Sequence, residues 1–309
     1  MAGPSLLDRR LLIVTGKGGV GKSTVAAALA LLASRRGKRV LVAEVNAQER
    51  VAPLLGAPPA GPVPREALPS LFTVDVDPQH ALEEYALMVV KVRAIYEAVF
   101  ETRLVRFFLR VTPSLPETLM LGKILHEARA ADARGRPRWD LVVLDAPATG
   151  HAVQLLGVPA SLLDTVPAGP LRRDAQWMQD LLADPARTAV CLVALPEEMP
   201  VVESIELDAR VRDELRLPRG VLVLNAVPEA RFGAEEGARL AALEGRPPPL
   251  GPAARAAVLQ ARRATEARRH ADRLRAALDL PAVEVPLLAE ERWGRKAIER
   301  VAGFLEGRI

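Results

Sequence analysis

The chain has 309 residues, of which 50% are hydrophobic and 26% charged, with a formal net charge of +4 at pH 7. This length and composition suit one large α/β core, or such a core with a helical subdomain. No apolar stretch reaches the roughly 18 residues that a membrane-spanning helix needs, so we predict no transmembrane segment. The first ten residues lack the apolar segment of a signal peptide, which predicts a cytoplasmic protein.

The single cysteine and the arrangement of the basic residues restrict the partners. Cys191 alone cannot form a disulfide within the chain or a cysteine-built zinc site within one subunit, so we predict no zinc. The sequence pI of about 9.6 comes mostly from arginines interspersed with Asp and Glu. The densest basic stretch, Arg262 to Arg275, has helical spacing and favours a solvated helix face over a nucleic-acid or anionic-lipid surface. We therefore do not expect nucleic acid as a partner.

Short apolar strands alternate with helical segments along the chain, which is typical of a doubly wound, mainly parallel sheet. The first strand is followed by a glycine-rich loop and an Ala/Leu-rich helix. Strands are predicted at 11–14, 40–43, 72–76, 141–144, 188–194, 220–224 and 283–285. The helix is predicted at 25–33, and Pro- and Gly-rich loops are predicted at 56–64, 134–137 and 246–252. No internal repeat is visible, so we predict one nucleotide site per chain.

The loop after the first strand has the spacing of a phosphate-binding loop, with Gly16, four further residues, and then Gly21, Lys22 and Ser23. Its glycines let backbone N–H groups surround a β-phosphate, Lys22 reaches the β- and γ-phosphate oxygens, and Ser23 offers its hydroxyl to Mg²⁺. The dipole of the following helix favours the same anion. The predicted nucleotide-binding positions are Gly16, Lys17, Gly18, Gly19, Val20, Gly21, Lys22, Ser23 and Thr24.

The lysine directly after the first glycine is not part of the general loop pattern. The run from Lys17 to Ser23 resembles the deviant Walker A loop of a class of dimeric ATPases, in which this lysine crosses the dimer interface. The resemblance implies that Lys17 neutralises transition-state charge on the nucleotide of a facing subunit, which would couple dimerisation to turnover. The alternative is a solvated lysine at the tip of a loop.

Asp145 follows a buried strand, where a carboxylate can hold Mg²⁺ through a water molecule, although an aspartate at this point also serves as a helix cap. The segment that it opens, 145–156, closely resembles switch II of the arsenite-pump ATPase (ArsA) and of its relatives that target tail-anchored membrane proteins. Further resemblances follow in the family's order at 73–78 with 81–85, at 222–225 and at 285–288. We therefore identify the chain as a member of the ArsA-type family.

The resemblance implies an α/β P-loop NTPase fold, with a doubly wound, mainly parallel sheet and a helical insertion. It also implies Mg²⁺ and ATP bound at a dimer interface, with Ser23 and Asp145 at the metal and Asn225, Pro286 and Leu287 beside adenine. We expect a single P-loop ATPase domain over residues 1–309, with a helical subdomain inserted at about 80–134. The predicted catalytic residues are Lys17, Lys22, Asn46 and Asp145.

Switch I departs from the family pattern. The family has an aspartate there that polarises the attacking water, whereas this chain carries Asn46. An amide can orient water but cannot accept its proton, so we expect slow hydrolysis unless Glu44, Glu49 or a partner subunit contributes. The chain also lacks the Cys-x-x-Cys of the zinc-joined relatives and a cysteine cluster for arsenite, so we expect no direct role in arsenite extrusion.

The insertion is rich in apolar residues. In the relatives that target tail-anchored proteins the corresponding helices form a groove for a client helix, which makes an apolar protein a candidate partner. The alternative is that these residues pack on one another and on a partner subunit. His151 follows switch II and could contact phosphate-linked water or cap the loop.

Three functions remain open at this point. The first is a dimeric ATPase, homodimeric or heterodimeric, whose nucleotide state opens and closes a client or partner surface. The second is a weakly hydrolysing regulatory subunit of a heterodimer with a paralogue, and the third is a partition-type ATPase that acts on DNA or membrane.

Overall fold

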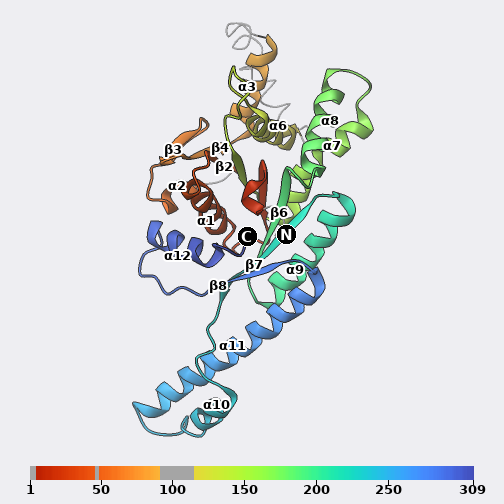
Figure 1. Cartoon of the computed structure of the whole chain (residues 1–309). Helices are drawn as coiled ribbons and strands as arrows, with labels where there is room; N and C mark the ends of the chain where they lie inside the picture. Colours follow the sequence, from red (N-terminus) through yellow and green to blue (C-terminus); the bar gives the residue numbers. More distant parts are fainter. Residues whose placement is uncertain (1–4, 46–48, 91–114) are drawn as a thin grey trace.

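In the computed structural model, one mixed sheet of eight strands forms the centre of the chain and helices cover both of its faces (Figure 1). The structure describes residues 5–45, 49–90 and 115–309, with only the backbone at 85–90 and at 170. The strand order is β3-β4-β2-β5-β1-β6-β7-β8, and every neighbouring pair is parallel except β3 with β4. The predicted doubly wound P-loop NTPase fold is confirmed.

All predicted strands are present, each within a few residues of its predicted bounds. The strands are β1 (Leu11–Thr15), β2 (Val40–Val45), β3 (Arg65–Leu68), β4 (Leu71–Val76), β5 (Leu141–Asp145), β6 (Thr188–Ala194), β7 (Arg219–Val227) and β8 (Ala282–Pro286). The edge strand β3 was not predicted, because its exposed Arg65 and Glu66 lack the alternation of apolar and polar residues that marks a strand.

The helices alternate with the strands as the sequence pattern indicates. They are α1 (Lys22–Arg35), α2 (Val51–Leu54), α3 (Pro78–Val90), α6 (Leu115–Arg129), α7 (Thr149–Thr165), α8 (Pro170–Ala183), α9 (Glu198–Ala209), α10 (Ala234–Ala241), α11 (Leu250–Leu278) and α12 (Arg295–Leu305). The predicted loop at 246–252 was wrong at its end, since Leu250 begins α11 and Pro252 lies in its first turn, where proline is tolerated.

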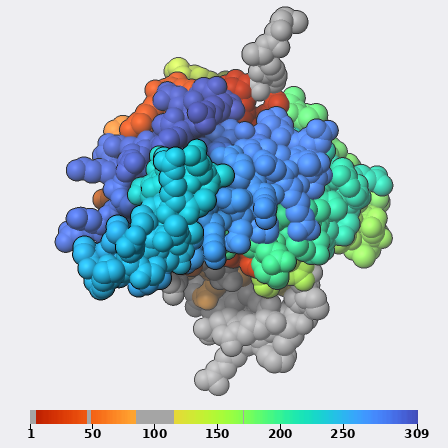
Figure 2. Space-filling model, turned by 90° about the horizontal axis from the view of Figure 1, so that it is seen from below, coloured from red at the N-terminus to blue at the C-terminus, as the bar shows by residue number. Residues whose placement is uncertain are grey.

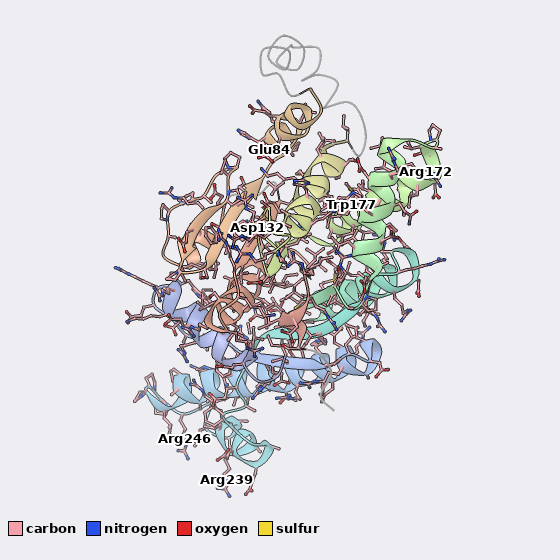
Figure 3. The ribbon with its side chains drawn as sticks, turned by 45° about the horizontal axis from the view of Figure 1, so that its top comes forward. Glu84, Asp132, Arg172, Trp177, Arg239 and Arg246 are labelled. Carbon is pink, nitrogen blue, oxygen red and sulfur yellow. The ribbon has the colours of Figure 1, made fainter. Side chains whose placement is uncertain are left out.

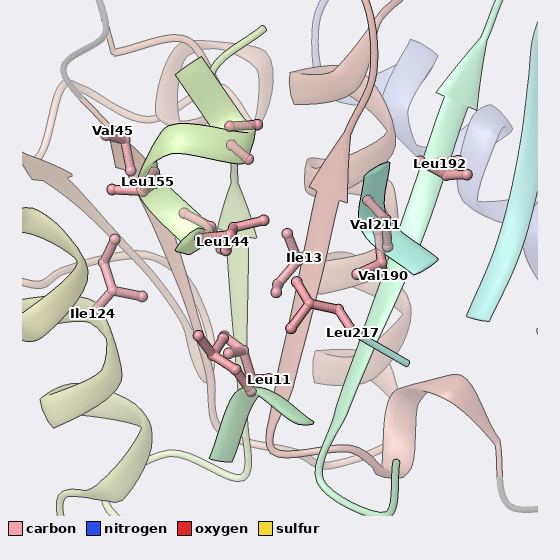
Figure 4. Close-up of a cluster of buried hydrophobic side chains, with 14 of the residues drawn as sticks. Leu11, Ile13, Val45, Ile124, Leu144, Leu155, Val190, Leu192, Val211 and Leu217 are labelled. Atoms are coloured by element: carbon pink, nitrogen blue, oxygen red, sulfur yellow. The ribbon is translucent and has the colours of Figure 1, made fainter. Parts of the chain in front are cut away.

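Two hydrophobic cores lie on opposite faces of the sheet. On one face α1 and α12 pack together, and the run from Val25 to Ala33 is buried because its alanines let the helix approach the strands closely. On the other face, side chains of α6, α7, α9 and α11 pack on the strands. Figure 4 shows Ile124 of α6 and Leu155 of α7 in this core. Both faces of the central strands are therefore dry, which explains their continuous apolar runs.

The predicted helical insertion at 80–134 is described only in part. Its helices α3 and α6 lie at one end of the sheet, and residues 91–114 are outside the described residues. On α6, Met120, Leu121, Ile124 and Leu125 are buried in the core against the sheet. The apolar residues of this helix therefore pack inward, and the extent of the subdomain stays a prediction.

Helices α10 and α11 form a hairpin that projects from the body of the molecule (Figure 1). Seen from below, α11 lies across one face of the molecule with the α10 region beside it (Figure 2). Arg239 and Arg246 lie at the far end of the hairpin (Figure 3). Among the described residues, no helix combines the length and the apolar character that crossing a membrane requires.

Candidate nucleotide site

The loop between β1 and α1 needs its glycines for steric reasons. Gly16 and Gly21 have φ values of 153° and 92°, in the region that L side chains rarely adopt. A Cβ on Gly16 would lie 2.1 Å from the Val193 carbonyl oxygen, and one on Gly21 would lie 2.3 Å from Asn225 Nδ2. At Gly16 and Gly21 the loop therefore packs against β6 and β7 with no room for a side chain.

Lys22 and Ser23 begin α1 and lie beside Asp145 at the end of β5. The Lys22 ammonium donates to the Lys17 carbonyl oxygen at 3.1 Å, and Ser23 Oγ donates to Asp145 Oδ2 at 2.5 Å. Burial lowers the pKa of Lys22, with the neighbouring Asp145 opposing this. The structure thus brings together the three residues that the sequence predicted for phosphate and metal.

Asp145 is nearly buried, and its second carboxylate oxygen, Oδ1, has no hydrogen-bond partner among the described residues. Burial raises the pKa of this carboxyl group, whereas the Ser23 hydrogen bond and the positive charges of Lys22 and Arg50 lower it. A hydroxyl and an unpartnered carboxylate oxygen are the kind of ligand that Mg²⁺ prefers. The residues therefore fit the predicted metal.

The two carboxylates considered as substitutes for a catalytic aspartate are both engaged with backbone N–H groups. Buried Glu44 accepts from the Arg50 amide at 2.7 Å and from the Val51 amide at 3.1 Å. Glu49 accepts from the Gly61 amide at 2.8 Å and from that of Ala60. Asn46 itself lies outside the described residues.

Glu44 also has an unusual charge environment. In the parallel pairing of β2 with β5 it lies opposite Asp145. Burial raises the pKa of Glu44 to about 7, the two amide hydrogen bonds oppose this, and Asp145 and Asp75 add repulsion. Glu44 is thus a carboxyl group that titrates near neutral pH, beside the predicted metal residues.

Lys17 makes an ion pair within its own chain. Its ammonium lies 2.6 Å from Glu203 Oε1 on α9, with about 30% of both side chains exposed. It is therefore not a freely solvated lysine, as one of the two interpretations of the sequence had it. No sequence signal pointed to Glu203, because α9 is distant in the chain and meets the loop only in the folded sheet.

A cavity of about 1300 Å³ opens in front of the loop. Of the predicted residues, Gly19 to Thr24, Asn225 and Leu287 line it. Asn225 Nδ2 donates to the Val20 carbonyl oxygen at 2.8 Å, and the Leu287 amide donates to the Val227 carbonyl oxygen at 2.9 Å. Gly16, Lys17, Gly18, Asp145 and Pro286 lie outside the wall of this cavity, with Asp145 joined to it through Ser23.

The wall of the cavity also includes residues that the sequence did not suggest. A stripe of α11 faces it at three- and four-residue spacing, and the half-exposed Trp293 and the exposed Arg50 complete it. The α11 residues are Arg263, Glu266, Ala267 and His270. The basic stretch interpreted as a solvated face thus turns one edge towards the cavity.

His151 is exposed in the first turn of α7.

Comparison with known proteins agrees with this geometry. The family model described as "Anion-transporting ATPase" (ArsA_ATPase) matches residues 9–167, which include the loop and Asp145. A putative ATPase of Mycobacterium bovis and the ATPase BagA of Mycobacterium tuberculosis are each 33% identical over 224 residues, 70% of this chain and 64% of theirs. An arsenical pump-driving ATPase of Escherichia coli is 28% identical over 243 residues, 70% of this chain and 39% of its own.

The chain thus spans 64% of the length of its mycobacterial relatives and a smaller share of the arsenical pump ATPases. The family match covers more than half of the chain and contains the P-loop, both metal candidates and switch II. The chain therefore belongs to the anion-transporting ATPase (ArsA) family.

Proposed function

We propose that this protein binds ATP with Mg²⁺ in the cavity in front of the P-loop and hydrolyses it slowly as a dimer in the cytoplasm. The nucleotide state would open and close a surface for a client or partner protein. The observation that carries the proposal is the hydrogen bond between Ser23 and Asp145 beside Lys22, where Ser23 and Lys22 line a cavity large enough for a nucleotide.

The roles follow from the chemistry of the side chains. Backbone N–H groups from Gly16 to Lys22 would surround the β-phosphate, and the Lys22 ammonium would exchange its contact with the Lys17 carbonyl for phosphate oxygens. Ser23 and the free oxygen of Asp145 would hold Mg²⁺, which neutralises charge on the β- and γ-phosphates when bound. Asn225 and the 286–287 segment would border the adenine.

Lys17 would act on the nucleotide of the facing subunit, as the loop pattern implies. In the single chain its charge is neutralised by Glu203, so the lysine has to leave this ion pair before it can cross an interface. ATP hydrolysis would then depend on dimerisation, because only in the closed dimer would Lys17 meet the triphosphate of the facing subunit, whose negative charge exceeds that of Glu203.

A regulatory subunit of a heterodimer is the second candidate. The observation that favours it is that Glu44 and Glu49 both accept backbone N–H bonds, so neither is free to replace the aspartate that Asn46 displaces. A partition-type ATPase that bound a membrane through α12 would need Ile298, Val301 and Leu305 at the surface, and all three are buried in the core.

Steady-state ATP hydrolysis with Mg²⁺, measured together with the mass in solution with and without ATP, tests the proposal. We expect slow turnover and an ATP-stabilised dimer, faster turnover in Asn46→Asp, and no ATP binding in Lys22→Ala. If the Asn46→Asp variant, assayed without any partner protein, remained as inactive as the wild type, the result would favour the regulatory subunit. Wild-type protein that binds no ATP would refute both candidates.

A further inference from the structure

Arg50 lines the cavity in front of the P-loop, and its side chain has no partner among the described residues. It directly precedes α2 and contributes to the same wall as Lys22 and Ser23. Its side chain is exposed, and among the described residues no hydrogen bond or ion pair engages its guanidinium group. An unpaired guanidinium that faces a cavity is an available ligand for an anion.

Arg50 lines the same cavity as Lys22 and Ser23, close enough for its charge to act on Lys22 and Asp145. Its positive charge acts on Lys22, whose pKa it lowers, and on Asp145, whose pKa it also lowers. Two cations, Lys22 and Arg50, thus line one cavity close enough for their charges to repel, and both are attracted to Asp145. Such an arrangement favours a multiply charged anion, which relieves the repulsion between the two cations.

A buried carboxylate, that of Glu44, holds the backbone of Arg50 by a hydrogen bond. Its amide donates to Glu44 Oε1 at 2.7 Å, and Glu44 is buried on the strand next to β5, opposite Asp145. The Arg50 main chain is therefore tied to the same part of the sheet that carries the predicted metal residue. A residue whose main chain is held in this way loses less backbone freedom on binding than one at the tip of a loop.

We propose that Arg50 is a phosphate ligand supplied by the chain's own subunit, and that it contacts the terminal phosphate of a bound nucleoside triphosphate. The P-loop amides would surround the inner phosphates, so the additional cation beside Lys22 and Asp145 would serve the outer one. Arg50 would then distinguish triphosphate from diphosphate. This inference rests on the proposed nucleotide function.

Binding of the non-hydrolysable Mg²⁺–AMP-PNP and of Mg²⁺–ADP, measured by isothermal titration calorimetry, tests the inference. In Arg50→Ala we expect affinity for AMP-PNP to fall by about tenfold or more, since a charged hydrogen bond is lost. Affinity for ADP should stay within about twofold, because the missing contact is to the third phosphate. Arg50→Lys should recover part of the loss, as it keeps the charge without the planar fork.

Arg65→Ala is the matched control. Arg65 is exposed on β3 and donates to the Pro59 carbonyl oxygen at 3.4 Å, outside the cavity wall, so its loss should leave both affinities unchanged. Thermal melting of each variant verifies folding, and Arg50→Gln, which keeps more of the side chain, replaces Arg50→Ala if that variant does not fold. Wild-type protein that binds neither nucleotide would refute the proposed function.

Wild-type protein that binds both nucleotides, with an Arg50→Ala variant that keeps the same ratio of affinities, would overturn the Arg50 inference alone. Equal losses for AMP-PNP and ADP would overturn it too, since they would indicate a general electrostatic effect or a contact to an inner phosphate.

Discussion

The ion pair between Lys17 and Glu203 predicts that the resting protein restrains its own lysine. The two charged groups lie 2.6 Å apart, and about 30% of each side chain is exposed, so solvent screens much of their attraction. A pair of this kind contributes about 0.2 to 1 kcal/mol. Glu203→Gln should therefore release Lys17 at a cost in unfolding free energy of no more than about 1 kcal/mol.

The same energy sets the expected kinetic gain. If Lys17 must leave Glu203 before it reaches the facing nucleotide, removing the pair should raise the ATPase rate by up to about fivefold, the factor that corresponds to 1 kcal/mol. The assay is steady-state hydrolysis at saturating ATP and fixed protein concentration, with light scattering to follow the dimer. Glu206→Gln, an exposed neighbour on α9, is the matched control and should change neither quantity.

Lys17→Ala provides the second arm of a double-mutant cycle. It should reduce turnover while ATP affinity stays within a few-fold. Glu203→Gln in that background should then bring no acceleration, because no lysine remains to be released. The reasoning fails if Glu203→Gln turns over no faster than wild type, or if it accelerates the Lys17→Ala variant equally.

Three further predictions concern the loop, a buried carboxyl group and the cysteine. Gly16→Ala should lose about 2 to 3 kcal/mol of stability through overpacking against the Val193 carbonyl oxygen and should lose nucleotide binding. Gly303→Ala, in an open position of α12, should be neutral or slightly stabilising in the same urea titrations, and similar results for both would contradict the steric argument. Glu44 has a folded-state pKa of about 7 against 4.5 for an unperturbed carboxyl group. Its proton therefore stabilises the fold below pH 4.5, and about 3 kcal/mol is lost as the pH rises through 7. Glu44→Gln should flatten this part of the stability profile in urea unfolding between pH 5 and 8, and an unchanged slope would show that Glu44 does not titrate there. Cys191 is fully buried and its thiol pKa is raised to about 12, so a thiol reagent should modify it only after denaturation. Labelling of the protein unfolded in guanidinium gives the reference of one reactive thiol per chain. Rapid labelling of the native protein would contradict the burial of Cys191.

Much of the fold and the centre of the site follow from local sequence patterns. The strands of the sheet are continuous apolar runs, and the P-loop is a contiguous motif whose glycines, lysine and serine have fixed positions. Asp145 was predictable because a strand end carries it to the same edge of the sheet. Each of these features depends on neighbours in the chain, which a sequence pattern can capture.

The remaining features depend on contacts between distant segments. Nothing near Lys17 indicates that Glu203, on a helix far along the chain, neutralises its charge. The α11 residues that face the cavity have the composition of an ordinary charged helix, and only the fold turns them towards it. The short edge strand β3 escaped prediction because its residues are partly exposed and follow no period.

Helix α11 extends from the wall of the cavity to the tip of the projecting hairpin. Its middle, around Arg263 and His270, borders the nucleotide cavity, whereas its first turn at Leu250 lies with α10 at the end of the projecting hairpin. From Leu250 to Arg263 a helix extends about 20 Å, at about 1.5 Å per residue. A tilt of about 10° at the cavity would thus displace the tip by roughly 3 Å. If a bound nucleotide tilted α11 at the cavity, the displacement would therefore be largest at the tip of the hairpin.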